Sequence, residues 1–147
     1  MKLRVAALIL VLGSLLVVLG CGGGPSQTAS NSQTAQPTSL TGQFNGEFIT
    51  NGQVTPNIVL VVNQTADKLS GTLFFGVIGT NCGQQTGNLS SASSVAGSSV
   101  FISVTTLNGV TLTINGQANS QQTAISGQYQ MSGWCGSSSG SAVFTKQ

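Results

Sequence analysis

Short runs of β-branched and aromatic residues, separated by glycine, asparagine and serine, recur from Gly42 to the end of the chain. In the clearest of them, residues 99–107 and 110–118, apolar side chains return at every second position. This period is that of a strand with one buried face, and no stretch in this part of the chain keeps a helical period. The pattern therefore predicts an all-β domain over residues 42–147.

Turn and glycine signals predict how these strands connect. The expected strands are 42–50, 57–63, 69–78, 84–90, 99–107, 110–118, 121–131 and 141–146. Asn108-Gly109 is a strong hairpin turn between two of them. Glycines between polar residues, typical of bends in a curved sheet, occur at Gly71, Gly87, Gly116 and Gly127. Eight short strands joined by short turns predict a small antiparallel up-and-down (meander) barrel, with a β-sandwich of Greek-key connections as the alternative.

The N-terminus has the parts of a secretory signal. A basic head over residues 1–4 is followed by residues 5–20, which carry no charge. This run of 16 residues is shorter than the ~20 that a membrane-spanning helix needs. It ends in Val18-Leu19-Gly20-Cys21, which resembles the lipobox of bacterial lipoproteins. A retained signal anchor and an ordinary signal peptide with a coincidental cysteine are the alternatives.

The resemblance implies that a helical signal peptide, residues 1–20, is cleaved and that Cys21 carries diacylglycerol on its sulfur. Two or more acyl chains give stable membrane anchoring. The protein would then be lipid-anchored in the cell envelope. Because Gly22 follows the cysteine, the resemblance places it in the outer membrane of a cell with two membranes, and otherwise on the outer face of the plasma membrane. Residues 21–41, rich in Gly, Ser, Thr and Gln with Leu40 as the one large apolar residue, are expected to form a disordered linker.

If Cys21 carries lipid, Cys82 and Cys135 remain as a pair in an oxidising compartment. They fall in the third-to-fourth and seventh-to-eighth connections of the predicted meander, which lie at the same mouth of the barrel. We predict that they form a disulfide. The alternative, a zinc site, is disfavoured because the chain has no histidine, and we predict no metal.

Charge is scarce once the signal peptide is removed. Glu47, Asp67, Lys68 and Lys146 are then the only side chains charged at neutral pH, and their charges sum to zero. The sequence offers neither the basic patch that nucleic acid requires nor the acidic cluster that calcium requires. Without histidine, Ser-His-Asp and Cys-His catalysis is excluded, and two carboxylates in different settings do not make a glycosidase pair. We predict no catalytic residue, no enzymatic activity and no cofactor.

Trp134, beside the predicted disulfide at the barrel mouth, is the best candidate for contacting a ligand. Its alternative role is to pack over the disulfide and plug the barrel. Tyr129 is the second candidate, although Phe74, Phe75, Phe101 and Tyr129 are all expected chiefly in the core.

In meander, size and glycine placement, the domain resembles the avidin and lipocalin barrels, and Gly127-Gln128-Tyr129 is similar to their strand endings. No binding residue is carried over from those families. Because an eight-stranded barrel encloses one small ligand or is filled by its own side chains, we expect a binding module for a small neutral ligand or an envelope partner. The alternative is a structural or assembly protein of the envelope that acts through its polar outer surface.

Overall fold

The computed structural model describes residues 38–76 and 80–147; the expected signal peptide, Cys21 and most of the expected linker lie outside them. The strands of the described residues are β1 (Gly42–Thr50), β2 (Gln53–Thr65), β3 (Lys68–Phe75), β4 (Gln85–Leu89), β5 (Ser94–Ala96), β6 (Ser99–Thr106), β7 (Thr111–Ala118), β8 (Ala124–Gly133) and β9 (Gly136–Lys146). Within the described residues the domain is all-β, as the sequence predicts.

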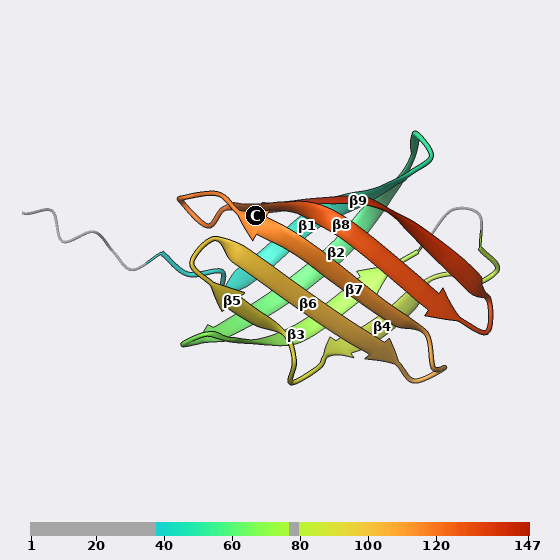
Figure 1. The fold of residues 1–147 in the computed structure, drawn as a ribbon, viewed down its shortest axis with the longest axis horizontal. Helices are drawn as coiled ribbons and strands as arrows, with labels where there is room; N and C mark the ends of the chain where they lie inside the picture. Colours follow the sequence, from blue (N-terminus) through green and yellow to red (C-terminus); the bar gives the residue numbers. More distant parts are fainter. Residues whose placement is uncertain (1–37, 77–79) are drawn as a thin grey trace, which may run out of the picture. The chain divides into compact units, whose positions relative to one another are not determined.

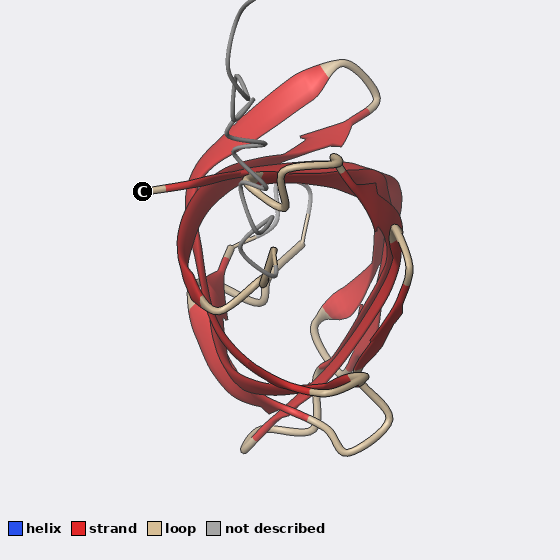
Figure 2. Cartoon of the chain, turned by 90° about the vertical axis from the view of Figure 1, so that its left-hand side faces the viewer, coloured by secondary structure: helices blue, strands red, loops and turns tan. Residues whose placement is uncertain are grey.

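Eight of these strands form a closed antiparallel barrel (Figures 1 and 2). The ring runs in sequence order through β1, β2, β3, β4, β6, β7, β8 and β9, and β9 pairs with β1 to close it. The predicted meander barrel is confirmed. Because every strand of the ring finds both of its neighbours within residues 42–146, the sheet closes without any residue that precedes Thr38.

The ninth strand, β5, arises because the strand position between β3 and β6 is interrupted and is occupied by two short strands, β4 and β5. β4 pairs with the second half of β6, and β5 pairs with its first half. Between the two pieces Ser93 is fully buried, and its hydroxyl accepts from the N–H of Ser103 at 3.0 Å and donates to the Ser103 carbonyl at 3.2 Å. This side chain thus satisfies the main chain of β6 where the partner strand departs. The segment 91–98, expected to be a loop, contains β5.

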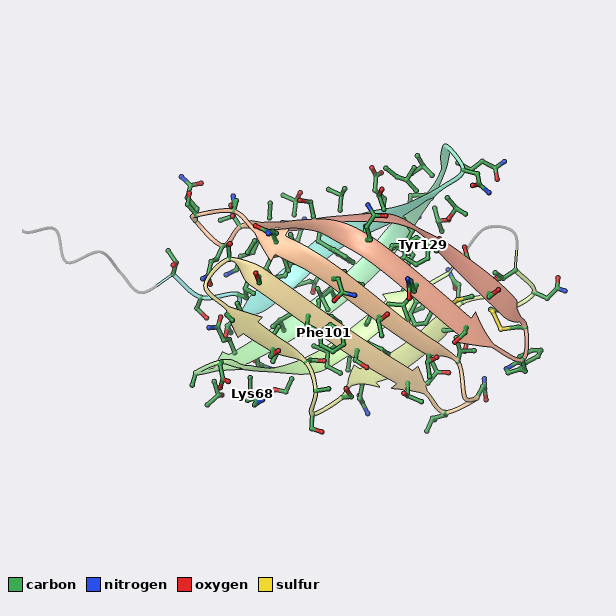
Figure 3. The ribbon with its side chains drawn as sticks, viewed as in Figure 1. Lys68, Phe101 and Tyr129 are labelled. Carbon is green, nitrogen blue, oxygen red and sulfur yellow. A yellow bond between two sulfur atoms is a disulfide. The ribbon has the colours of Figure 1, made fainter. Side chains whose placement is uncertain are left out.

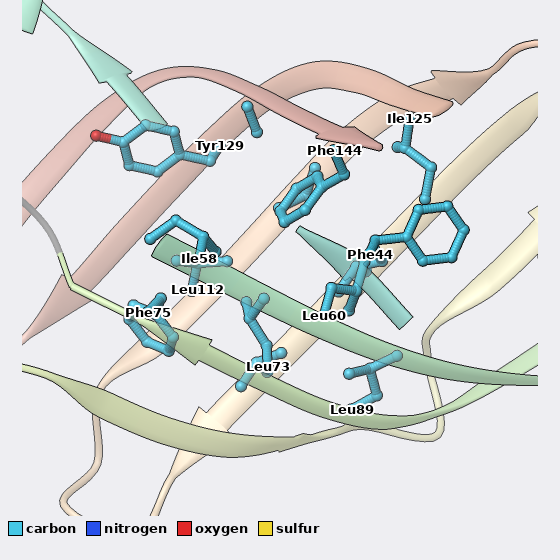
Figure 4. Packing of buried hydrophobic residues seen from close by; sticks show 14 of the residues in the cluster. Phe44, Ile58, Leu60, Leu73, Phe75, Leu89, Leu112, Ile125, Tyr129 and Phe144 are labelled. Atoms are coloured by element: carbon cyan, nitrogen blue, oxygen red, sulfur yellow. The ribbon is translucent and has the colours of Figure 1, made fainter. Parts of the chain in front are cut away.

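Apolar side chains from the strands fill the barrel (Figure 4). Its largest fully buried members include Phe44, Phe48, Phe75, Tyr129 and Phe144. The Phe48 ring stacks on Tyr129 with 4.3 Å between ring centroids and meets Phe144 edge-to-face at 6.2 Å. These are the offset and T-shaped arrangements that aromatic rings favour.

Glycine lets neighbouring strands approach closely where β7 meets β8. Gly116 pairs with Gly127 across the ladder. A Cβ on Gly116 would lie 2.6 Å from the Ser126 carbonyl oxygen, and one on Gly127 would overlap the Asn115 carbonyl oxygen. Both positions therefore need glycine for the sheet to curve this tightly, which agrees with the bends predicted at these residues.

The barrel has two distinct ends, visible at the left and right of Figure 1. The proximal end receives the chain from Thr38 and carries the β2–β3, β5–β6 and β7–β8 turns together with the C-terminus. The distal end carries the β1–β2, β3–β4, β6–β7 and β8–β9 connections.

The residues that precede β1 pack against the proximal end. Leu40 is fully buried, and its N–H donates to the Gln64 side-chain oxygen at 2.9 Å. The Lys146 ammonium donates to the Ser39 carbonyl at 2.9 Å and lies 5.7 Å from the centroid of the Phe44 ring. The last residues of the expected linker are thus part of the folded domain.

A disulfide between Cys82 and Cys135 spans the distal end, which confirms the predicted pair (Figure 3). It joins the β3–β4 connection to the β8–β9 turn. In the ring, β6 and β7 separate these connections on one side, and β1 and β2 separate them on the other. The disulfide therefore lies across the mouth, where the Asn81 N–H also donates to the Cys135 carbonyl at 3.2 Å and the buried Gln85 amide donates to the Cys82 carbonyl.

Candidate functional site

The two residues predicted to contact a ligand lie in different environments. Trp134 occupies the β8–β9 turn and leaves 70% of its surface exposed, so it does not plug the barrel. Tyr129 is fully buried, and its hydroxyl is hydrogen-bonded to Thr50 Oγ1 and, at 2.9 Å, to Ser138 Oγ. The structure does not bring these two side chains into one site, and Tyr129 presents no surface to solvent.

Two of the four aromatic residues expected in the core point outward instead. Phe75 and Tyr129 are buried as expected, whereas Phe74 and Phe101 lie half-buried on the outer wall. The expectation for Phe74 and Phe101 was wrong because strand alternation decides their direction. The residues on either side of each ring point into the barrel, so the ring between them points out.

The outward side chains of β6–β9 form an uncharged surface around Phe101, which we call the polar face (Figure 3). It consists of Ser103, Thr105, Thr111, Thr113, Asn115, Gln117, Ser126, Gln128, Gln130, Ser132, Ser137, Ser139 and Ser141 around Phe101. Hydrogen bonds tie parts of this surface together, as between Thr111 Oγ1 and Ser132 Oγ at 2.9 Å. Ser98 Oγ also donates to Gln117 Oε1, and Gln128 Nε2 donates to Ser141 Oγ, each at 3.3 Å. Each of these amides keeps a further donor or acceptor for a ligand.

Two open grooves cross the polar face. The distal groove, of about 550 Å³, runs between β7, β8 and β9 and is lined mainly by hydroxyl groups. The proximal groove, of about 480 Å³, places Phe101 among the amide side chains of Asn115, Gln117 and Gln128. Both volumes fall in the range of small-molecule sites, about 300–1,000 Å³.

A third groove of about 300 Å³ lies over β1 and β9, where Glu47 and Val143 line it. All three grooves are on the outer wall of the barrel.

Hydrogen bonding to neutral groups is the chemistry that the polar face offers. Hydroxyl and amide side chains both donate and accept hydrogen bonds. The charged side chains of the described residues lie elsewhere: Asp67 and Lys68 at the β2–β3 turn, Lys146 at the end of β9, and Glu47 on β1. No charge on this face would balance that of an ionic ligand.

Sequence reasoning named the polar outer surface only as a surface for envelope assembly, and it did not place Phe101 there. The signal was present, because Phe101 shares the alternation of Ser103 and Thr105 and therefore belongs to the outer surface. What the sequence could not provide is the register that sets Phe101 opposite Asn115, and Asn115 opposite Gln128.

The chain shows no significant similarity to the known proteins with which it was compared: no protein-family model matches it, and no curated protein does. Among residues 38–76 and 80–147, no three His, Cys, Asp or Glu side chains gather in a way that could hold a metal ion. In the same residues, no helix has the length and apolar character to cross a membrane.

Proposed function

We propose that this chain is a lipid-anchored protein of the bacterial cell envelope that binds a neutral, hydroxyl-rich ligand, such as an uncharged glycan, on its polar face. The proximal groove carries the proposal, because there Phe101 lies among three amide side chains on a surface without charge. A sugar ring has apolar C–H faces and hydroxyl edges. An aromatic ring surrounded by amide and hydroxyl groups matches both.

The packing of the barrel favours the outer wall over the interior as the binding surface. Apolar side chains occupy the space between the strands, and the large aromatic rings among them are fully buried. Leu40 packs into the core at the proximal end, and the disulfide crosses the distal end. A ligand on the polar face needs none of these side chains to move.

Replacing Phe101 by alanine should weaken binding of a neutral sugar about thirtyfold, since aromatic anchors at the centre of an interface typically contribute about 2 kcal/mol or more. The measurement is isothermal titration calorimetry of residues 38–147 with uncharged N-acetylglucosamine oligomers. Phe74→Ala is the matched control, because Phe74 is also half-buried and outward-facing but lies on β3. Equal affinity of the two variants, or no saturable binding by the unmodified domain, would contradict the proposal.

The lipid anchor is tested on the full-length chain. Cys21→Ser should abolish acylation, so that the protein moves from the membrane fraction to the soluble fraction, because one sulfur carries the acyl chains that hold it. Mass spectrometry of the unmodified mature protein should show added acyl mass on Cys21. Cys82→Ser is the control and should keep its acyl mass; a mature protein without acyl mass on Cys21 would refute the anchor, whatever membrane contact the rest of the chain makes.

A further inference from the structure

Two large apolar side chains project from neighbouring hairpins at the distal end. Leu107, in the β6–β7 turn, is fully exposed, and Trp134, in the β8–β9 turn, is 70% exposed. The hairpins lie side by side because β7 pairs with β8 as far as Thr111 and Ser132. Beyond that pair, Val110 contacts Gly133 so closely that a Cβ on Gly133 would lie 2.9 Å from Val110 Cγ2.

The hairpins that carry these side chains hold no charge. The β6–β7 turn consists of leucine, asparagine, glycine and valine between two threonines, and the β8–β9 turn consists of tryptophan and cysteine between two glycines. Of the charged residues described, Asp67, Lys68 and Lys146 lie at the proximal end, and Glu47 faces outward on the barrel wall. An apolar tip free of nearby charge enters an apolar medium without the cost of desolvating ions.

We propose that the distal end binds a lipid bilayer by inserting Leu107 and Trp134 into its interfacial region. Tryptophan is enriched at the boundary between headgroups and hydrocarbon, because its ring is apolar and its N–H finds a polar partner there. Leucine at the adjacent tip reaches the apolar side of the same boundary. The serine, threonine and asparagine residues beside them then remain among the headgroups.

The backbone of both tips is constrained by the fold, so insertion does not require the turns to become ordered. At the β6–β7 turn, the Val110 N–H donates to Thr106 Oγ1 at 3.1 Å, and the Gly109 N–H donates to the Thr106 carbonyl at 3.0 Å. At the β8–β9 turn, Trp134 precedes Cys135 of the disulfide. Preorganised contact residues lower the entropic cost of binding.

A bilayer suits this end better than a protein partner does. Stable protein interfaces bury about 1,600 Å² in total over a broad, complementary surface. Two side chains projecting from narrow hairpin tips supply far less area. A bilayer is deformable and demands no matching shape, so it is the surface that two such tips can use.

The test uses residues 38–147, which contain the whole closed ring, with phosphatidylcholine vesicles. Trp134 is the only tryptophan of the chain, so its emission reports on this end alone. We expect a blue shift on adding vesicles, quenching by brominated lipid, and co-sedimentation that does not weaken from low to high ionic strength. Leu107→Ser and Trp134→Ser should each reduce partitioning about tenfold, judged from the apolar area removed.

Val143→Ser is the matched control, because Val143 is a 38% exposed apolar residue of the barrel wall and should not affect partitioning. Each variant is first shown to have an unchanged melting temperature. Absence of a blue shift, partitioning that requires anionic lipid, or an equal loss in Val143→Ser would each overturn the proposal. Loss of sugar binding in Phe101→Ala with vesicle binding retained would show that the two surfaces act separately.

Discussion

Substituting alanine for Phe48 should lower the free energy of unfolding by about 3–5 kcal/mol, the usual cost of truncating a buried phenylalanine. Phe48 is fully buried on β1, where its ring stacks on Tyr129 at 4.3 Å and meets Phe144 at 6.2 Å. Its loss leaves a cavity between the two rings, and ladder pairing on both sides of β1 prevents the strand from collapsing into that space.

Urea unfolding of residues 38–147, followed by circular dichroism, measures this effect. Phe74→Ala removes the same ring from a half-buried outward position and should cost less than half as much. If the two substitutions shifted the midpoint equally, the assignment of Phe48 to the centre of the core would fail.

Removing the disulfide should have an effect of similar size. Cys82 and Cys135 are 53 residues apart, and cross-linking a loop of this length stabilises a fold by about 4 kcal/mol in the chain-entropy description. For a domain of this size that corresponds to a fall in melting temperature of roughly 15 °C. The bridge joins opposite sides of the ring, so without it the β3–β4 connection and the β8–β9 turn are no longer held together at the distal end. The contacts of Leu40 at the proximal end remain.

The measurement compares melting curves of residues 38–147 with the Cys82→Ala/Cys135→Ala variant, each with and without reductant. Reductant should lower the melting temperature of the unmodified domain toward that of the variant, and should leave the variant unchanged. A difference of only a few degrees between oxidised domain and variant would show that the bridge contributes little to stability.

The sequence predicted the barrel because its strongest signals are local. β6 and β7 have the alternation of a half-buried strand, and Asn108-Gly109 lies in the turn between them. The meander then followed from short connections alone, and it placed both cysteines at one mouth. Alternation, turn residues and short connections all involve residues close together in the sequence, so they can be recognised from one sequence.

The strand bounds that were mispredicted depend on pairing with another strand. We expected β2 to begin after Pro56, but it begins at Gln53. The ladder passes from Gly46↔Ile58 to Phe48↔Thr55, so β2 holds one extra residue at Pro56–Asn57, and Asn57 has φ 64°. At such a bulge the missing proline N–H costs no ladder bond.

β9 begins at Gly136 and not at the expected residue 141. The sequence did not predict its first half because that half has no alternating apolar residues. Its inward positions there are Ser138 and Gly140, which face the large ring of Tyr129 on β8. A bulky residue on one strand requires small ones on the next. That requirement cannot be read before the register is known.

For the candidate site too, one part could be predicted from the sequence and another part depends on the pairing of strands. Composition alone indicates that any ligand is neutral, since Glu47, Asp67, Lys68 and Lys146 are the only charged side chains after residue 20. The grouping of Phe101 with amides from β7 and β8 depends on cross-strand register. The exposure of Trp134 depends on which way a turn projects, and the sequence carries no signal for that.

The closed ring also bears on how copies of this protein behave when they are crowded together. A surface almost without charge gives molecules little mutual repulsion, so crowded copies collide freely. Sheets fuse where a peripheral strand leaves its N–H and C=O groups unsatisfied, and here β9 and β1 bond to one another and remove that template. The closed topology of the sheet, rather than electrostatic repulsion, therefore opposes amyloid-like association between copies of the domain.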